Sequence, residues 1–185
     1  VVMVQDDRIL GRYWDSENTP RPEAFKREME LKKGANHPEF YRSLRAACAS
    51  GWDFSSRWLE DQKSFHTIWI LDLLPVDLNA LLYYLEKTLA EFATLRGEKE
   101  KSACYQNAAE KRKKAIQTLF WNEKEEFFFD YHFQKETTTE VWSLAGVAPL
   151  FLKIASTRQA QCVAKHLEDK FLCSGGFVTS LTHSS

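Results

Sequence analysis

The clearest periodic pattern in the chain is a run of apolar residues that begins just after Asp77. They are spaced three and four positions apart: Leu78, Leu81, Leu82, Leu85, Leu89 and Phe92. This spacing is typical of one face of an α-helix, and Gly97 stands where the C′ residue would end that helix. A second long helix is predicted over about 98–121. Its apolar face would carry Tyr105, Ala109, Ile116 and Phe120.

Shorter helices are predicted on both sides of this pair. Their approximate ranges are 22–33, 37–49, 141–155 and one opened by the capping-box residues Ser156-Thr157-Arg158-Gln159. Extended or irregular chain is predicted at 1–20, 51–72 and 174–185, and a short hairpin strand at 127–133. Amphipathic helices need neighbours to cover their apolar stripes, which predicts an all-α toroid or solenoid of paired helices in one domain.

Composition and charge narrow the possible partners. With 7 glycines and 5 prolines in 185 residues, long elements are favoured over a turn-rich β-sandwich. The chain has 25 basic and 26 acidic residues, a net charge of −1, which gives no electrostatic basis for binding nucleic acid or an anionic membrane. The basic run at 110–114 lacks interleaved aromatic residues and is predicted to be a solvated helix face. The predicted partner is a small molecule.

No membrane or targeting segment is recognisable. The longest apolar run, 144–152, is well short of the roughly 20 residues that span a bilayer. The first residues have no secretory signal pattern, so a cytoplasmic location is expected, and a periplasmic or secreted one is left open. Because the chain begins with Val1 rather than Met, it is expected to be an interior piece of a longer polypeptide, and a processed or renumbered terminus is the alternative.

Four cysteines match neither a zinc pattern nor a small disulfide scaffold. The sharpest metal alternative combines Cys162, His166 and Cys173, of which the first two are one helical turn apart. A helical face of mixed residues usually just packs, so no metal site is predicted.

The densest candidate chemistry surrounds Asp53. This carboxylate follows Gly51 and lies between the aromatic residues Trp52 and Phe54. Such surroundings would desolvate the carboxyl group and raise its pKa, which is the property that a general acid needs. The alternative is that the rings belong to the core and that Asp53 caps a turn at 55–56.

Arg21 and Glu23 form a second candidate. They flank Pro22, so in an extended segment both side chains point to one side. Together they can donate to and accept from sugar hydroxyls, and the alternative is a surface charge pair at a helix start. Asp77 and Asn79 are most simply helix-start residues.

Four stretches of the chain form a recognisable series. They are Pro20-Arg21-Pro22-Glu23, Ser50-Gly51-Trp52-Asp53-Phe54-Ser55-Ser56-Arg57-Trp58, Pro75-Val76-Asp77-Leu78-Asn79-Ala80-Leu81-Leu82 and Gly175-Gly176-Phe177. In order and spacing they resemble trehalases of the glycoside hydrolase type, from about Gly11 to the last residue. The stretch 50–58 is the most specific of the four.

The resemblance implies that residues 1–185 are the central part of one (α/α)6 toroid, with less than half of its helices and a short β hairpin. It implies hydrolysis of α,α-trehalose to two glucose molecules with inversion and without a cofactor. By matching position, Asp53 would be the general acid. Arg21, Pro22, Glu23 and the backbone of Gly51 would bind the sugar.

An inverting glycosidase also needs a second carboxylate as base, about 6.5–9.5 Å from the acid. In the family this base follows a Gln-Trp-Asp-x-Pro-x-Gly-Trp-Ala-Pro signature, which would begin just after 183–185, and another signature would precede Val1. The chain is therefore expected to depend on flanking segments of its own domain and to be inactive alone. Its leucine stripe, including Leu82 and Leu85, is expected to be partly uncovered.

Four positions depart from the resemblance, of which Ala49, in place of a frequent Glu, is matched by small residues in some members of the family. Ile70 and Leu71 stand where a Thr-Thr pair is usual, and Ala148 stands where an aromatic residue commonly precedes Pro-Leu. The competing hypothesis is a non-catalytic helical protein, either a remnant of a decayed trehalase gene or a sugar-binding piece.

Overall fold

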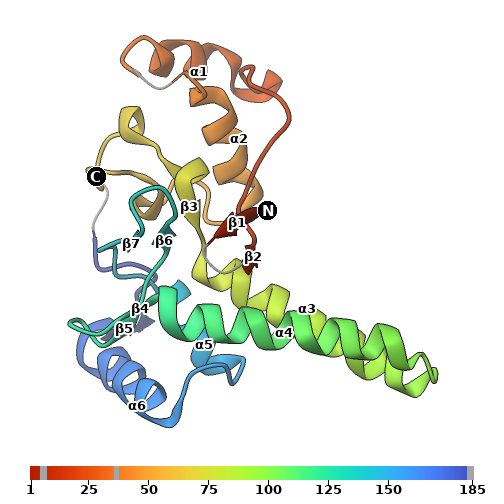
Figure 1. Ribbon diagram of the computed structural model, residues 1–185. Coiled ribbons are helices and arrows are strands. Elements are labelled where there is room, and N and C mark those ends of the chain that lie inside the picture. Colours follow the sequence, from red (N-terminus) through yellow and green to blue (C-terminus); the bar gives the residue numbers. More distant parts are fainter. Residues whose placement is uncertain (5–7, 36–37, 183–185) are drawn as a thin grey trace.

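The computed structural model describes residues 1–4, 8–35 and 38–182 (Figure 1). Helices predominate, and small antiparallel sheets lie between them. The two long helices, α3 (Val76–Leu95) and α4 (Lys99–Leu119), form an antiparallel pair that projects from the rest of the molecule (Figure 1). Gly97, with a φ of +73°, donates its N–H to Thr94, and Glu98 donates to Ala93. This is the Schellman end predicted for the first long helix.

Alanines and a tyrosine, rather than leucines, form the buried face of α3. Ala80, Tyr83, Ala90 and Ala93 are buried, whereas Leu81, Leu85 and Phe92 are more than half exposed. Leu78, Leu82 and Leu89 are half-buried. The leucine stripe is therefore only partly covered, as expected, because the small alanines let α4 approach the opposite face closely.

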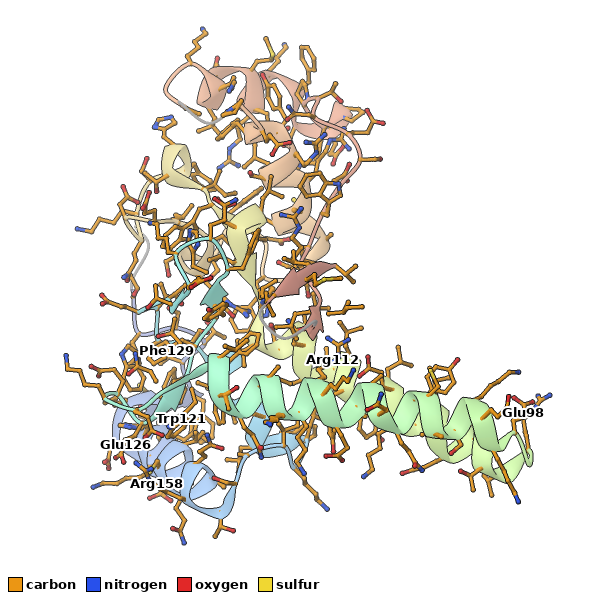
Figure 2. All side chains as sticks on the ribbon, viewed as in Figure 1. Glu98, Arg112, Trp121, Glu126, Phe129 and Arg158 are labelled. Carbon is orange, nitrogen blue, oxygen red and sulfur yellow. The ribbon has the colours of Figure 1, made fainter. Side chains whose placement is uncertain are left out.

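The basic run on α4 is not entirely solvated. Arg112 is buried and binds Glu86 of α3 through two hydrogen bonds of 2.7 and 2.9 Å, and Asn79 through a third of 3.0 Å. Figure 2 shows Arg112 between the tip of the pair, marked by Glu98, and the body of the molecule. The prediction of a solvated face is wrong at this residue, since a guanidinium with two partners on α3 faces that helix.

The N-terminal part combines a hairpin with two short helices. Strands β1 (Val2–Val4) and β2 (Arg8–Leu10) pair antiparallel, with Val2 opposite Leu10. A 3-10 turn, η2 (Pro22–Ala24), leads into α1 (Phe25–Lys32), and α2 spans Phe40–Ala49. The predicted start of that helix at His37 lies outside the described residues.

The aromatic segment after α2 contains only short 3-10 turns, in agreement with the predicted loop. These are η3 (Ser56–Trp58), η4 (Phe65–Thr67) and η5 (Ile70–Asp72). Their apolar side chains join those of α2 in one of two core clusters: Phe40, Leu44, Trp58, Leu59, Ile68, Ile70, Leu71 and others.

Two small sheets replace the single strand predicted at 127–133. Strands β4 (Trp121–Asn122) and β5 (Phe127–Phe128) pair with each other. Strand β6 (Tyr131–His132) instead lies between β3 (Leu73–Leu74) and β7 (Thr137–Thr138). The segment is split because β5 and β6 pair with different partners, β4 and β3, and residues 129–130 lie between the two strands.

The C-terminal part corrects two further predictions. The helix expected at 141–155 is reduced to a 3-10 turn, η6 (Leu144–Val147), and one helical turn, α5 (Ala148–Phe151). Ser143 is extended and bridges Ser180, and Pro149 is tolerated only in a first helical turn, so no continuous helix can form. Residues in the predicted tail loop contribute to a hairpin, β8 (Leu172–Cys173) with β9 (Gly176–Phe177).

Helix α6 (Thr157–His166) begins with the predicted capping box and continues into a π-helical turn, η7 (Leu167–Phe171). In the described ranges, no helix combines the length and the hydropathy needed to cross a membrane. The same ranges hold no group of three metal-ligating side chains, including the alternative at Cys162, His166 and Cys173.

Candidate active site

A cleft of about 630 Å³ lies beside the turn that follows α2. One wall comes from the most specific stretch of the sequence, and the opposite wall comes from the segment after β9. The lining residues are Gly51, Trp52, Asp53, Ser55 and Ser56 on the first wall and Val178, Thr179, Ser180 and Thr182 on the second. Apart from Gly51, Trp52 and Val178, these residues carry small polar side chains, which suits a ligand rich in hydroxyl groups.

The turn that carries Asp53 has an unusual backbone. Gly51 has a φ of +73° and Asp53 a φ of +35°, so two residues lie in the left-handed region. Glycine adopts this region freely and aspartate tolerates it better than most residues. Asp53 is exposed among the described residues. The prediction that Trp52 and Phe54 desolvate its carboxyl group is therefore wrong. The capping alternative is also wrong, because Ser55 rather than Asp53 caps η3 by accepting the Arg57 N–H.

Directly behind this turn, Arg57 is completely buried between two carboxylates. Its guanidinium donates to Asp130 at 2.6 and 2.6 Å and to Asp77 at 2.7 and 2.9 Å. Burial lowers the pKa of Arg57, but the charges and hydrogen bonds of Asp130 and Asp77 raise it by more. The net pKa is therefore above the ordinary value. Asp130 also accepts the Val76 N–H at 2.9 Å, which ties the network to the first residue of α3.

Trp52 connects this network to the cleft. Its indole N–H donates to Asp77 at 2.8 Å, and its ring lies 4.9 Å from the Arg57 guanidinium. Burial raises the pKa of Asp77, but the hydrogen bond and charge of Arg57 lower it more, so the net pKa is below its ordinary value. The sequence-based interpretation of Asp77 as a helix-start residue missed these contacts. The sequence signal that could have indicated these contacts is that Arg57 and Asp130 are charged residues next to aromatic ones in the sequence.

Arg21 is held in place by the buried Glu28 and the half-buried Cys48. Its backbone N–H and its Nε donate to the two oxygens of Glu28, at 2.8 and 2.6 Å, and Nη1 donates to the Cys48 sulfur at 2.7 Å. Burial lowers the pKa of Arg21, but Glu28, Cys48 and Glu23 together raise it more, so the net pKa is above its ordinary value. The Glu28 side chain is only 2% exposed. Sequence reasoning did not identify Glu28, which lies outside the quoted stretches.

Glu23 lies on the same side as Arg21, with 3.7 Å between Oε1 and Nη1, and its side chain is 70% exposed. Pro22 begins η2 rather than an extended strand, so the two side chains meet for a different backbone reason than the one predicted. Arg21, Pro22 and Glu23 are not lining residues of the cleft.

Cys48 nevertheless lies near both candidate groups. Burial raises the pKa of its thiol, Arg21 lowers it, and Asp53, Glu28 and Glu23 raise it. The Arg21 guanidinium is also 5.5 Å from the ring of Phe54, the residue after Asp53. The structure therefore brings Gly51 and Asp53 together in the cleft and places the Arg21 group beside the same turn.

Three of the departures from the family pattern, Ile70, Leu71 and Ala148, lie away from the cleft. Ile70 and Leu71 are buried in the core cluster around α2, and Ala148 packs against the other core cluster. None of them is a lining residue.

The sequence matches the family model for trehalase over residues 1–185. The periplasmic trehalase of Salmonella paratyphi C is 41% identical over 187 residues, which cover 100% of this chain and 33% of that protein. The chain thus spans about a third of the length of the curated relatives it matches.

Solved structures show the same fold. The neutral trehalase of Saccharomyces cerevisiae superposes with a TM-score of 0.73 at 22% identity, covering 96% of this chain and 37% of that chain. A mannosylglycerate hydrolase from Thermus thermophilus, in complex with glucose, gives a TM-score of 0.52 at 18% identity, covering 76% and 34%.

Proposed function

The chain belongs to the trehalase family, and from this premise we propose that its cleft is part of an active site that hydrolyses α,α-trehalose to two glucose molecules with inversion. The observation that carries the proposal is the position of Asp53, the one carboxylate among the described lining residues. In the proposed mechanism, protonated Asp53 donates to the glycosidic oxygen as the bond to the sugar breaks.

The exposed position of Asp53 fits a site that is completed by further polypeptide. Inverting hydrolysis needs a second carboxylate to activate water, about 6.5–9.5 Å from the acid. The described lining residues include no such group, so we assign the base to sequence beyond these residues, in the missing part of an (α/α)6 toroid. On this proposal residues 1–185 alone do not turn trehalose over at an enzymatic rate.

Arg21, Pro22, Glu23 and the backbone of Gly51 are proposed to bind the sugar. Glu28 and Cys48 fix the Arg21 guanidinium, which reduces the conformational entropy lost when it donates to a hydroxyl group. The exposed Glu23 carboxylate remains available as an acceptor. The position of Ile70, Leu71 and Ala148 outside the cleft favours an enzyme over the decayed remnant.

The location of the protein is proposed to be the periplasm. The expected cytoplasmic location finds no support, because the periplasmic trehalase of Salmonella paratyphi C is 41% identical to this chain. Fractionation of cells that express the full-length protein, with trehalase activity assayed in each fraction, tests this assignment.

The test of the catalytic proposal is glucose release from trehalose by the full-length protein and its Asp53→Asn variant. Asparagine keeps the shape of the side chain but cannot donate a proton, so turnover should fall by about 10²–10⁴-fold with an unchanged melting temperature. Asp169→Asn, an exposed carboxylate away from the cleft, is the matched control and should keep full activity. An active Asp53→Asn enzyme would refute the assignment.

A further inference from the structure

The turn that presents Asp53 has few connections of its own. The Trp52 N–H donates to the Ser50 hydroxyl, and the Ser55 N–H donates to the Trp52 carbonyl. Gly51 has nothing within 4 Å of the place where a Cβ would stand. Two left-handed residues in an open turn do not fix a carboxyl group by themselves, because local bonds between neighbours move with the turn.

The side chain of Trp52 supplies the connection to the core. It is half-buried and packs against both core clusters. Its indole N–H donates a hydrogen bond to the Asp77 carboxylate, and the Arg57 guanidinium stacks over the face of its ring. Trp52 is covalently adjacent to Asp53, so a displacement of the indole moves the backbone that carries the Asp53 carboxyl group.

The network that fixes Asp77 joins three segments of the chain. Arg57 belongs to η3, Asp77 lies in the first turn of α3, and Asp130 lies between β5 and β6. Asp77 Oδ2 accepts from both Arg57 and Trp52, at 2.9 and 2.8 Å, so one oxygen joins the network to the turn. Arg57 is fully buried and can form this many charged hydrogen bonds only in one arrangement, which makes the anchor rigid.

We propose that Asp77, acting through the indole N–H of Trp52, is a positioning residue that sets the place of the Asp53 carboxyl group. The inference rests on the proposed role of Asp53 as general acid. General acid catalysis requires the donor within hydrogen-bond distance of the leaving oxygen, and a misplacement of about 1 Å can cost about 10²-fold in rate. The Arg57 network then serves catalysis through geometry, without touching the substrate.

The test compares Trp52→Phe with Trp69→Phe in the full-length protein. Both changes remove an indole N–H from a half-buried tryptophan, but among the described residues the Trp69 N–H has no hydrogen-bond partner and Trp69 does not line the cleft. We expect Trp52→Phe to lower kcat by about 10- to 100-fold with KM changed less than about threefold, and Trp69→Phe to leave kcat unchanged. Equal losses in the two variants, or a loss confined to KM, would overturn the proposal.

A second arm uses Asp77→Asn and the double variant Trp52→Phe/Asp77→Asn. If Asp77 acts on Asp53 only through Trp52, the kcat of the double variant is no lower than that of the more impaired single variant. Independent, multiplicative losses, or losses that simply follow the melting temperature, would show an ordinary structural role. Full activity of Asp53→Asn would instead refute the proposed function, whereas an inactive Asp53→Asn with a fully active Trp52→Phe refutes only the positioning role.

Discussion

Gly51 and Gly97 share one backbone conformation in two different places. Both have a φ of +73° and open space around the position of a Cβ, but only Gly51 lines the cleft. Alanine at either position enters the left-handed region, at a cost of about 1–2 kcal/mol. We expect Gly51→Ala and Gly97→Ala to lower the melting temperature similarly, and only Gly51→Ala to impair trehalose turnover. Equal activity of both variants would argue against a role for the Gly51 backbone.

Asp77 gives the fold a dependence on acid pH. Although burial raises its pKa, Arg57 lowers it more, to below the ordinary 3.8. A group whose pKa is lower in the folded state contributes stability above its unfolded pKa, and the contribution is lost as pH falls through the folded pKa. The contribution is therefore complete at pH 7 and declines below about pH 4.

Thermal melts of the wild type and Asp77→Asn between pH 7 and pH 3 check this expectation. The variant should be less stable at pH 7, and the difference in melting temperature should narrow below about pH 4. A difference that stays constant over this range would mean that Asp77 is not ionised against Arg57 in the folded protein.

Single residues were predictable only where their neighbours in sequence carry the signal. Asp53 stands out as a candidate because a carboxylate between two aromatic residues is unusual, and its predicted role comes from the resemblance of residues 50–58 to trehalases. Its exposure was not predictable, because burial depends on what the rest of the fold places over the turn. Asp77 and Asp130 were missed as a pair, since they are far apart in sequence and only the buried Arg57 joins them.

At the level of the elements, Arg112 links α4 to α3 through hydrogen bonds to Glu86 and Asn79. Its bidentate contact with Glu86 lies between the helices, and removal of one partner of a buried pair costs about 3–5 kcal/mol. We expect Arg112→Ala to lose stability of this order, towards the lower end because Glu86 keeps some contact with solvent. Lys111→Ala, its exposed neighbour in the same basic run, should change stability by less than about 0.5 kcal/mol. Urea denaturation of both variants measures the difference, and equal losses would contradict the assignment.

The long helices and the capping box of α6 were predictable because their signals are local and periodic. The face that α3 buries was not, since periodicity identifies a stripe but not which neighbour covers it. The helix predicted at 141–155 failed for a long-range reason, because Ser143 pairs with Ser180 across 37 positions of sequence. A second long-range contact lies at Gly146, whose backbone packs so closely on the Phe128 carbonyl oxygen that a Cβ would clash with it.

At the scale of the whole molecule, two core clusters are joined at the cleft. Trp52 packs against both, so the proposed acid lies next to the junction rather than on either cluster. The α3–α4 pair extends away from this junction (Figure 1), and on the leucine-rich face of α3 the side chains of Leu81, Leu85 and Phe92 are more than half exposed. A partial toroid accounts for this exposure, because each helix of a closed ring packs against two neighbours.

That face provides the last prediction. Leu81, Leu85 and Phe92 are 57%, 51% and 58% exposed, and contiguous exposed apolar surface binds hydrophobic ligands. Residues 1–185 alone should therefore bind a hydrophobic dye, and replacing all three residues by glutamine should reduce that binding. If another helix covers the face in the full-length protein, the same triple variant should bind little dye there but lose several degrees in melting temperature, whereas Lys111→Ala should not. A full-length triple variant that melts like the wild type would show that no further helix packs on this face.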